Sequence, residues 1–139
     1  MNVKYKSEQN AKAAELLIRE STKDGDFYMA AIHCAYYSCV QLIKHVLCNN
    51  CEINYDYQIE QPKKLKKSSH IFLLNTIKKN MRKKSISARN IRSIETSFYE
   101  LKRLRIKADY SDEKIIIDNA ENAIEKSKEI INEITEIYN

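Results

Sequence analysis

This chain contains one glycine and one proline in 139 residues, Gly25 and Pro62. Tight turns and hairpins rely on these two residue types, so the sequence disfavours an all-β fold and a doubly wound α/β fold. Abundant Lys, Glu, Leu and Ala suit long helices instead. An apolar content of 43% is too high for a disordered chain. We therefore expect one all-α domain, spanning residues 1–139, with a hydrophobic core of its own.

Apolar residues recur at helical spacing in five segments. These segments cover about residues 7–21, 27–48, 68–81, 86–108 and 111–137. Gly25 is expected to end the first helix, and Asp24 or Asp26 to cap the second. Residues 49–67 contain Pro62 and a lysine cluster, and they are expected to form a loop. Short connections between long amphipathic helices predict an up-and-down antiparallel bundle of four to five helices.

Two helices have features that bear on their placement. The segment 27–48 is apolar nearly all round, which predicts the central helix of the bundle. Its polar exceptions share one edge and are spaced by four residues: His33, Tyr37, Gln41 and His45. The last helix is expected to begin near Ser111, because Asp112 and Glu113 would then lie in its positive first turn.

The charge is concentrated in the middle of the chain. Residues 61–107 carry 15 basic and 2 acidic groups, a net charge of +13, between flanks of −2 and −6. Such a block suits nucleic acid or another polyanion as a partner, and a solvated lysine-rich surface is an equally simple interpretation. DNA binding by this block is a third functional hypothesis, which predicts steep salt dependence.

The sequence favours a cytoplasmic protein without metal or cofactor. The first residues, "MNVKYKSEQNAKAAE", lack the apolar core of a signal peptide, and no stretch approaches the roughly 18 apolar residues of a membrane span. The four cysteines lie between residues 34 and 51, too close together for a disulfide framework. His45, Cys48 and Cys51 are spaced like metal ligands, but no fourth ligand is evident for a closed zinc shell.

Arg105 interrupts an otherwise apolar face near the end of the fourth segment. The helical steps 91, 94, 98, 101 and 108 are all apolar, whereas position 105 is arginine. A guanidinium keeps its charge when it is desolvated, so Arg105 needs a carboxylate, a carbonyl or an incoming phosphate. Asp109 lies four residues on and is placed to pair with it, and Tyr110 follows. A structural ion pair without further function is one interpretation, and an anion site is the other.

Three stretches resemble, in order and spacing, the HEPN family (higher eukaryotes and prokaryotes nucleotide-binding domains). "AIHCAYYSCVQLIKHVL" at 31–47 is similar to the family's central helix. "SSHIFLLNTI" at 68–77 is similar to the start of its next helix, and "LKRLRIKADYSD" at 101–112 to the stretch before its last helix. The resemblance covers about residues 7–137. It implies a helical bundle, usually a homodimer, with a polar cleft at the dimer axis.

The same resemblance implies an activity and its site. Many members are metal-independent RNases of toxin–antitoxin or phage-defence systems, with a motif of Arg, four to six residues, and His. One branch carries Arg-x-x-x-x-His-x-Tyr; laid on this chain it starts at Arg103, places Ala108 in the histidine position and ends at Tyr110. The motif histidine is therefore replaced, and an alanine cannot transfer a proton. A substitute would have to be Tyr110, Asp109 or His70, of which His70 has the more suitable ordinary pKa.

We therefore expect RNA or a nucleotide to bind in a cleft, with two functional alternatives. The binding residues are expected to be Arg103, Arg105, Asp109, Tyr110, His33 and Tyr37, and cleavage would be attack of a 2′-OH on phosphate, with Arg105, Tyr110 and His70 as catalytic residues. The alternative is a non-catalytic HEPN protein that binds a nucleotide or a partner protein. The resemblance implies a minimal nucleotidyltransferase antitoxin as such a partner, with AMP transfer onto Tyr110. Tyr36 is expected to be packed in the core, with its hydroxyl hydrogen-bonded.

Overall fold

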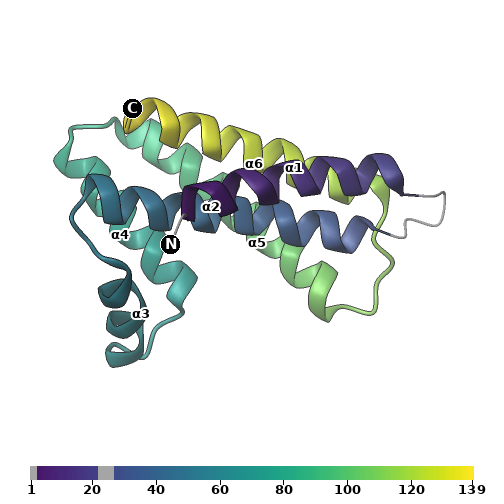
Figure 1. The fold of residues 1–139 in the computed structure, drawn as a ribbon, viewed down its shortest axis with the longest axis horizontal. Helices are drawn as coiled ribbons and strands as arrows, with labels where there is room; N and C mark the ends of the chain where they lie inside the picture. The colour runs from purple at the N-terminus through teal and green to yellow at the C-terminus, as the bar shows by residue number, and fades with distance from the viewer. Residues whose placement is uncertain (1–2, 22–26) are drawn as a thin grey trace.

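The computed structural model describes residues 3–21 and 27–139, which form six helices and no strand (Figure 1). The helices are α1 (Val3–Glu20), α2 (Tyr28–Asn50), α3 (Tyr55–Lys64), α4 (Ser69–Lys83), α5 (Ala88–Tyr110) and α6 (Ile117–Ile137). The all-α prediction is confirmed for this part of the chain, but one helix more is present than the four to five expected. The break predicted at Gly25 and the caps predicted at Asp24 or Asp26 lie outside the described residues.

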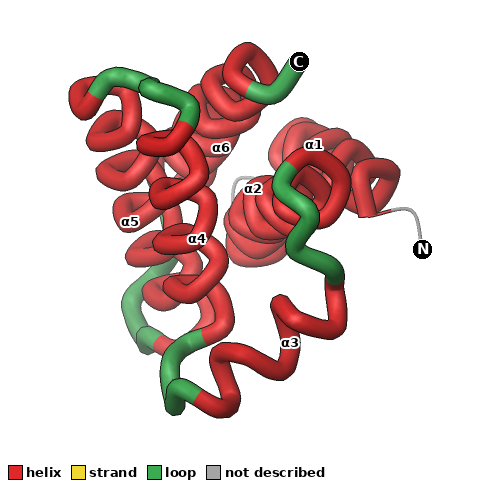
Figure 2. Tube along the Cα trace, turned by 90° about the vertical axis from the view of Figure 1, so that its left-hand side faces the viewer, coloured by secondary structure: helices red, strands yellow, loops and turns green. Residues whose placement is uncertain are grey.

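The second helix is the centre of the fold, as its all-round apolar character predicts. It packs against all five other helices described, and α1 runs antiparallel to it (Figure 1). α5 and α6 form a second antiparallel pair, while α3 and α4 lie at one end of the long axis (Figures 1 and 2). The buried apolar side chains form one cluster, with Tyr36 and Phe98 among its largest fully buried members. No helix in the described ranges is both long enough and apolar enough to cross a bilayer.

The prediction of a loop at residues 49–67 is wrong, because α3 lies within this range. Asn54 caps the helix, its side-chain oxygen accepting a hydrogen bond from the Tyr57 backbone N–H at 2.9 Å. The buried face of α3 consists of Gln58 and Pro62, so the sequence shows no apolar stripe there. Gln58 donates from its side-chain amide to the carbonyls of Lys44, at 3.1 Å, and Ile53, at 2.9 Å. The buried amide of Gln58 therefore holds α3 against α2 by hydrogen bonds, where apolar contacts usually hold a helix.

The predicted start of the last helix is also wrong, because α6 begins at Ile117 and not near Ser111. The two acids assigned to its first turn lie in the preceding connection, where the Glu113 backbone N–H donates to the Ser111 hydroxyl at 3.0 Å. The Glu113 carboxylate pairs with Lys107 of α5 at 3.2 Å. Asp118 takes the place predicted for these acids at the positive end of α6.

Candidate functional site

Arg105 is held on the core-facing side of α5. Ser87 caps this helix by accepting a hydrogen bond from the Asn90 backbone N–H at 3.1 Å, and the helix continues through Tyr110. Leu101, Leu104 and Ala108 on the same side are at most 2% exposed. The Arg105 side chain is 13% exposed, so a permanent charge is largely removed from water at the edge of the core.

The partners of Arg105 leave its hydrogen-bonding capacity incompletely used. One guanidinium nitrogen lies 3.6 Å from an Asp109 carboxylate oxygen, which confirms the pairing expected from the four-residue spacing but is too long for a good hydrogen bond. The guanidinium also stacks over two rings, Tyr36 at 4.9 Å and Tyr110 at 6.0 Å from the ring centres. Its Nε is buried without a hydrogen-bond partner among the described residues. An anion that accepts from this group would satisfy donors that the protein leaves open.

His70 joins the site from α4 through the hydroxyl of Tyr36. Burial, together with the positive charges of Arg105, Lys44 and Lys102, lowers the pKa of His70 to about 4. Burial raises the pKa of Tyr36 to about 12, against the opposing effect of Arg105. At neutral pH the phenol is therefore protonated and the imidazole is neutral. The Tyr36 hydroxyl and Nδ1 of His70 form a hydrogen bond of 2.8 Å, which joins α2 to α4 within the site.

His33 lies at the solvent-exposed edge of the site. Its Nδ1 lies 3.4 Å from the same Asp109 oxygen that faces Arg105, and the His33 side chain is 50% exposed. Its ring packs on Tyr37 with 4.6 Å between ring centres, and the Tyr37 ring lies 5.6 Å from that of His70. Side chains from α2, α4 and α5 therefore form one continuous group, called here the Arg105 cluster. It consists of His33, Tyr36, Tyr37, His70, Arg105, Asp109 and Tyr110.

Two of the residues singled out in the sequence lie apart from this group. Arg103 is exposed, and two residues along a helix correspond to roughly 200° of rotation, so it points away from Arg105. Ala108, which stands where the family motif has histidine, is 1% exposed and belongs to the core. Tyr110, by contrast, is 75% exposed at the end of α5. A histidine at position 108 would therefore have its Cβ inside the core.

Tyr36 belongs to the site although the sequence predicted only a packing role for it. The prediction of a packed ring with a bonded hydroxyl is confirmed, since Tyr36 is 0% exposed and bonds to His70. Its ring also carries the guanidinium of Arg105. The signal available in the sequence was the tyrosine pair Tyr36–Tyr37 beside the polar edge of the helix. That signal does not predict that the partner of Tyr36 is His70, which lies 34 residues further along the chain in α4.

The low pKa of His70 predicts a specific loss of stability in acid. The unfolded chain protonates this histidine near its ordinary pKa of about 6.5, whereas the folded chain resists protonation down to about 4. Between these values the unfolded state binds more protons, so the free energy of unfolding falls as the pH falls from about 6.5 to 4. We expect the contribution of His70 to be on the order of 1–2 kcal/mol, after allowance for partial exposure. Urea unfolding of the wild type and His70→Gln at pH 7 and pH 4.5 measures it.

In that comparison, the His70→Gln variant should lose less stability between the two pH values than the wild type. His45→Gln is the comparison variant, because this histidine lies outside the Arg105 cluster and is bonded to Asn49 at 3.1 Å. Burial lowers its pKa as well, but less than that of His70, so its replacement should relieve a smaller part of the acid sensitivity. Equal acid sensitivity of the wild type and His70→Gln would show that the ring is not held neutral in the folded protein.

The possible metal ligands do not come together in the structure. Among the residues described, no group of three or more His, Cys, Asp or Glu side chains is arranged to hold a metal ion. His45 instead accepts from the Asn49 amide, within α2. Cys51 is partly buried against the core cluster, where burial raises its thiol pKa.

Comparisons of the whole chain with family models, with curated proteins and with solved structures find no match. The assignment to the HEPN family therefore stays a prediction, drawn from three sequence motifs whose residues meet in the Arg105 cluster.

Proposed function

We propose that this protein is a HEPN-type domain that engages RNA through the Arg105 cluster. The observation that carries the proposal is the state of the guanidinium, which is largely buried, lies 3.6 Å from the Asp109 carboxylate and has an Nε without a hydrogen-bond partner within residues 3–21 and 27–139. A phosphate is tetrahedral and presents two acceptor oxygens at once to the planar fork of the guanidinium. A purely structural arginine at this depth would be expected to have its donors saturated by the protein.

The charge around the cluster supports a polyanionic ligand. Lys44 and Lys102 are close enough to His70 to lower its pKa, and residues 61–107, which include Arg105, carry a net charge of +13. Such a field attracts RNA to the site and accelerates encounter. Asp109 offsets one positive charge within the cluster and keeps Arg105 oriented until a phosphate competes for it.

The exposed end of α5 supports a shared site between two copies of the chain. Ile106 and Tyr110 are 43% and 75% exposed, and their spacing of four residues places them on one face of the helix. A second copy that packs on Ile106 would enclose the Arg105 cluster in a groove with Tyr110 on its wall. In such a groove Tyr110 offers a ring on which a base stacks.

The stronger form of the proposal adds cleavage of the RNA without metal. The 2′ oxygen attacks phosphorus and loses its proton, the bond from phosphorus to the 5′ oxygen breaks, and that oxygen gains a proton. Arg105 stabilises the charge that develops on the phosphorane. A pKa of about 4 makes His70 weak for proton transfer at neutral pH. His33, half exposed and held at Nδ1 by Asp109, is better placed to move the protons.

Incubation of labelled tRNA and total RNA with the purified protein in EDTA tests this proposal. We expect bound RNA and products ending in 2′,3′-cyclic phosphate, both dependent on Arg105. His33→Ala is expected to cut about 100-fold more slowly while it still binds, because general acid–base catalysis contributes at least that factor. Arg103→Ala, which removes an equal charge outside the cluster, is the matched control.

Binding without cutting would remove the cleavage step and leave the binding proposal in place. Absence of binding by the wild type, or equal activity of Arg105→Ala, would contradict the proposal as a whole. The exposed pair Ile106 and Tyr110 favours a second candidate, a non-catalytic protein that docks a partner such as a nucleotidyltransferase at the end of α5. In that case the protein co-purifies with the product of the neighbouring gene and does not bind RNA.

A further inference from the structure

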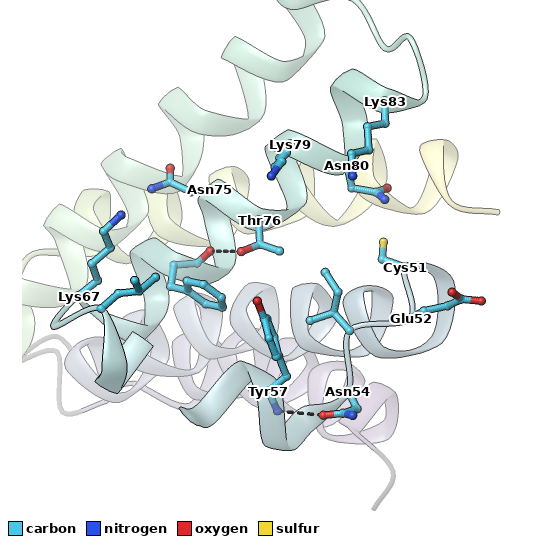
Figure 3. A pocket seen from close by; sticks show the side chains of 13 residues that line it. Cys51, Glu52, Asn54, Tyr57, Lys67, Asn75, Thr76, Lys79, Asn80 and Lys83 are labelled. Atoms are coloured by element: carbon cyan, nitrogen blue, oxygen red, sulfur yellow. Dashed lines mark hydrogen bonds between the residues drawn. The ribbon is translucent and has the colours of Figure 1, made fainter. Parts of the chain in front are cut away.

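A second candidate binding site lies between α3 and α4, on the side of α4 that faces away from the core. It is a cavity of about 620 Å³, within the range of pockets that hold small molecules or single nucleotides. Its walls come from α3, α4 and the connection after α2. Figure 3 shows the Tyr57 ring extending from α3 toward α4, whose side chains Thr76, Lys79 and Lys83 lie on the opposite wall.

The charge in this cavity is positive and unpaired. Lys67, Lys79 and Lys83 line it, against a single acidic side chain, Glu52. Within the described part of the chain, no carboxylate lies within ion-pair distance of these three lysines. Lys78 shows the contrast: it is one residue from Lys79, points the other way and forms an ion pair with Glu95 of α5. The lysines of the cavity are therefore available to an anion.

The cavity also offers aromatic surface. Tyr57 is 48% exposed, and its ring lies 6.4 Å from that of Phe72 on α4. The two rings are tilted by 48°, and about half of the Tyr57 side chain remains exposed within the cavity, where a planar group can reach it. Asn75 is exposed on the same wall and adds an amide that can donate and accept hydrogen bonds.

We propose that this cavity is a site for single-stranded RNA, in which a base stacks on Tyr57 while Lys67, Lys79 and Lys83 hold the neighbouring phosphates. Aromatic rings beside a basic groove are the usual means of binding single strands without sequence preference. A base inside a duplex cannot reach a ring within a cavity, so the site selects unpaired nucleotides. The inference rests on the proposed RNA-binding function and extends it.

The two sites lie on opposite sides of the same helix. His70, near the start of α4, belongs to the Arg105 cluster, whereas Lys79 and Lys83 follow on the outer face of α4, which spans roughly 20 Å from end to end. Lys67 lines the cavity just before the start of α4, so a strand held there would reach the Arg105 cluster by passing around the start of α4. The cavity would then supply affinity that the cluster alone lacks.

Fluorescence anisotropy with a labelled single-stranded ten-nucleotide RNA and a duplex of the same length tests the inference. Tyr57→Leu, which keeps an apolar side chain but removes the ring, is expected to weaken binding of the single strand about 10-fold, within the range of base–aromatic stacking. Tyr57→Phe is expected to restore it. The triple variant Lys67→Gln, Lys79→Gln, Lys83→Gln should reduce the slope of log K against log salt by about 2, because each phosphate contact adds about 0.7.

The matched control removes three lysines outside the cavity: Lys4→Gln, Lys12→Gln, Lys114→Gln, all exposed. Equal losses in the two triple variants, or unchanged binding by Tyr57→Leu, would show only general attraction to a polyanion and overturn the inference. A wild type that binds no RNA would overturn the proposed function as well. Loss of binding in Arg105→Gln with full binding in Tyr57→Leu would leave the proposed function and remove the second site. Thermal unfolding of each variant shows that α3 is still folded.

Discussion

Replacement of Phe98 by alanine should lower the free energy of unfolding by about 3–5 kcal/mol, the usual cost of removing a large aromatic side chain from a core. Phe98 is 1% exposed, and its ring packs against that of Tyr36 at 5.7 Å. The cavity left behind borders α2, the helix that contacts all the others described. For a chain of this length the midpoint of thermal unfolding should fall by about 10–20 °C. Urea unfolding followed by circular dichroism measures the change.

Tyr99→Ala is the matched control for this variant. Tyr99 is the next residue, also aromatic and 44% exposed, so its removal should cost less than about 1 kcal/mol. The dependence of stability on urea concentration should stay the same in both variants. Similar stabilities of Phe98→Ala and Tyr99→Ala would mean that α5 does not bury the face that carries Phe98.

Much of the helical architecture is predictable because apolar spacing is local. The central position of α2 follows from its all-round apolar sequence, and the buried face of α5 follows from Ile91, Ile94 and Phe98. Apolar spacing does not predict α3, because Gln58 and Pro62 make up its buried face. The start of α6 is not predicted for another reason. Asp112 and Glu113 are suitable acids for a first turn, but the residues between α5 and Ile117 do not form a helix.

The contacts of the candidate site are also predictable only where they are local in sequence. The pairing of Arg105 with Asp109 follows from a spacing of four residues, which a single helix is enough to satisfy. The contacts of His70 with Tyr36 and of His33 with Asp109 join residues 34 and 76 positions apart. No spacing rule brings such residues together. The resemblance to HEPN domains predicts only that His33 and His70 lie near Arg105, and it does not predict the contact of His70 with Tyr36. The sequence does not predict the cavity between α3 and α4, because residues 49–67 carry the pattern of a loop and not of a helix.

Replacement of Arg105 by glutamine should weaken RNA binding about 30-fold or more. Truncation of one partner of a buried charge pair typically costs at least 2 kcal/mol, and the Arg105 side chain is 13% exposed. Glutamine keeps a donor of similar reach but lacks the charge and the planar fork that matches phosphate. Arg103→Gln should weaken binding only a few-fold, since an exposed side chain contributes little more than its screened charge.

The most direct measurement is the equilibrium affinity of the wild type, Arg105→Gln and Arg103→Gln for one labelled single-stranded RNA at the same salt concentration. The account predicts that the loss for Arg105→Gln exceeds the loss for Arg103→Gln by about 10-fold, with all three proteins equally folded by circular dichroism. Equal affinities of the two variants would contradict it, because the largely buried guanidinium would then act as no more than one of many surface charges.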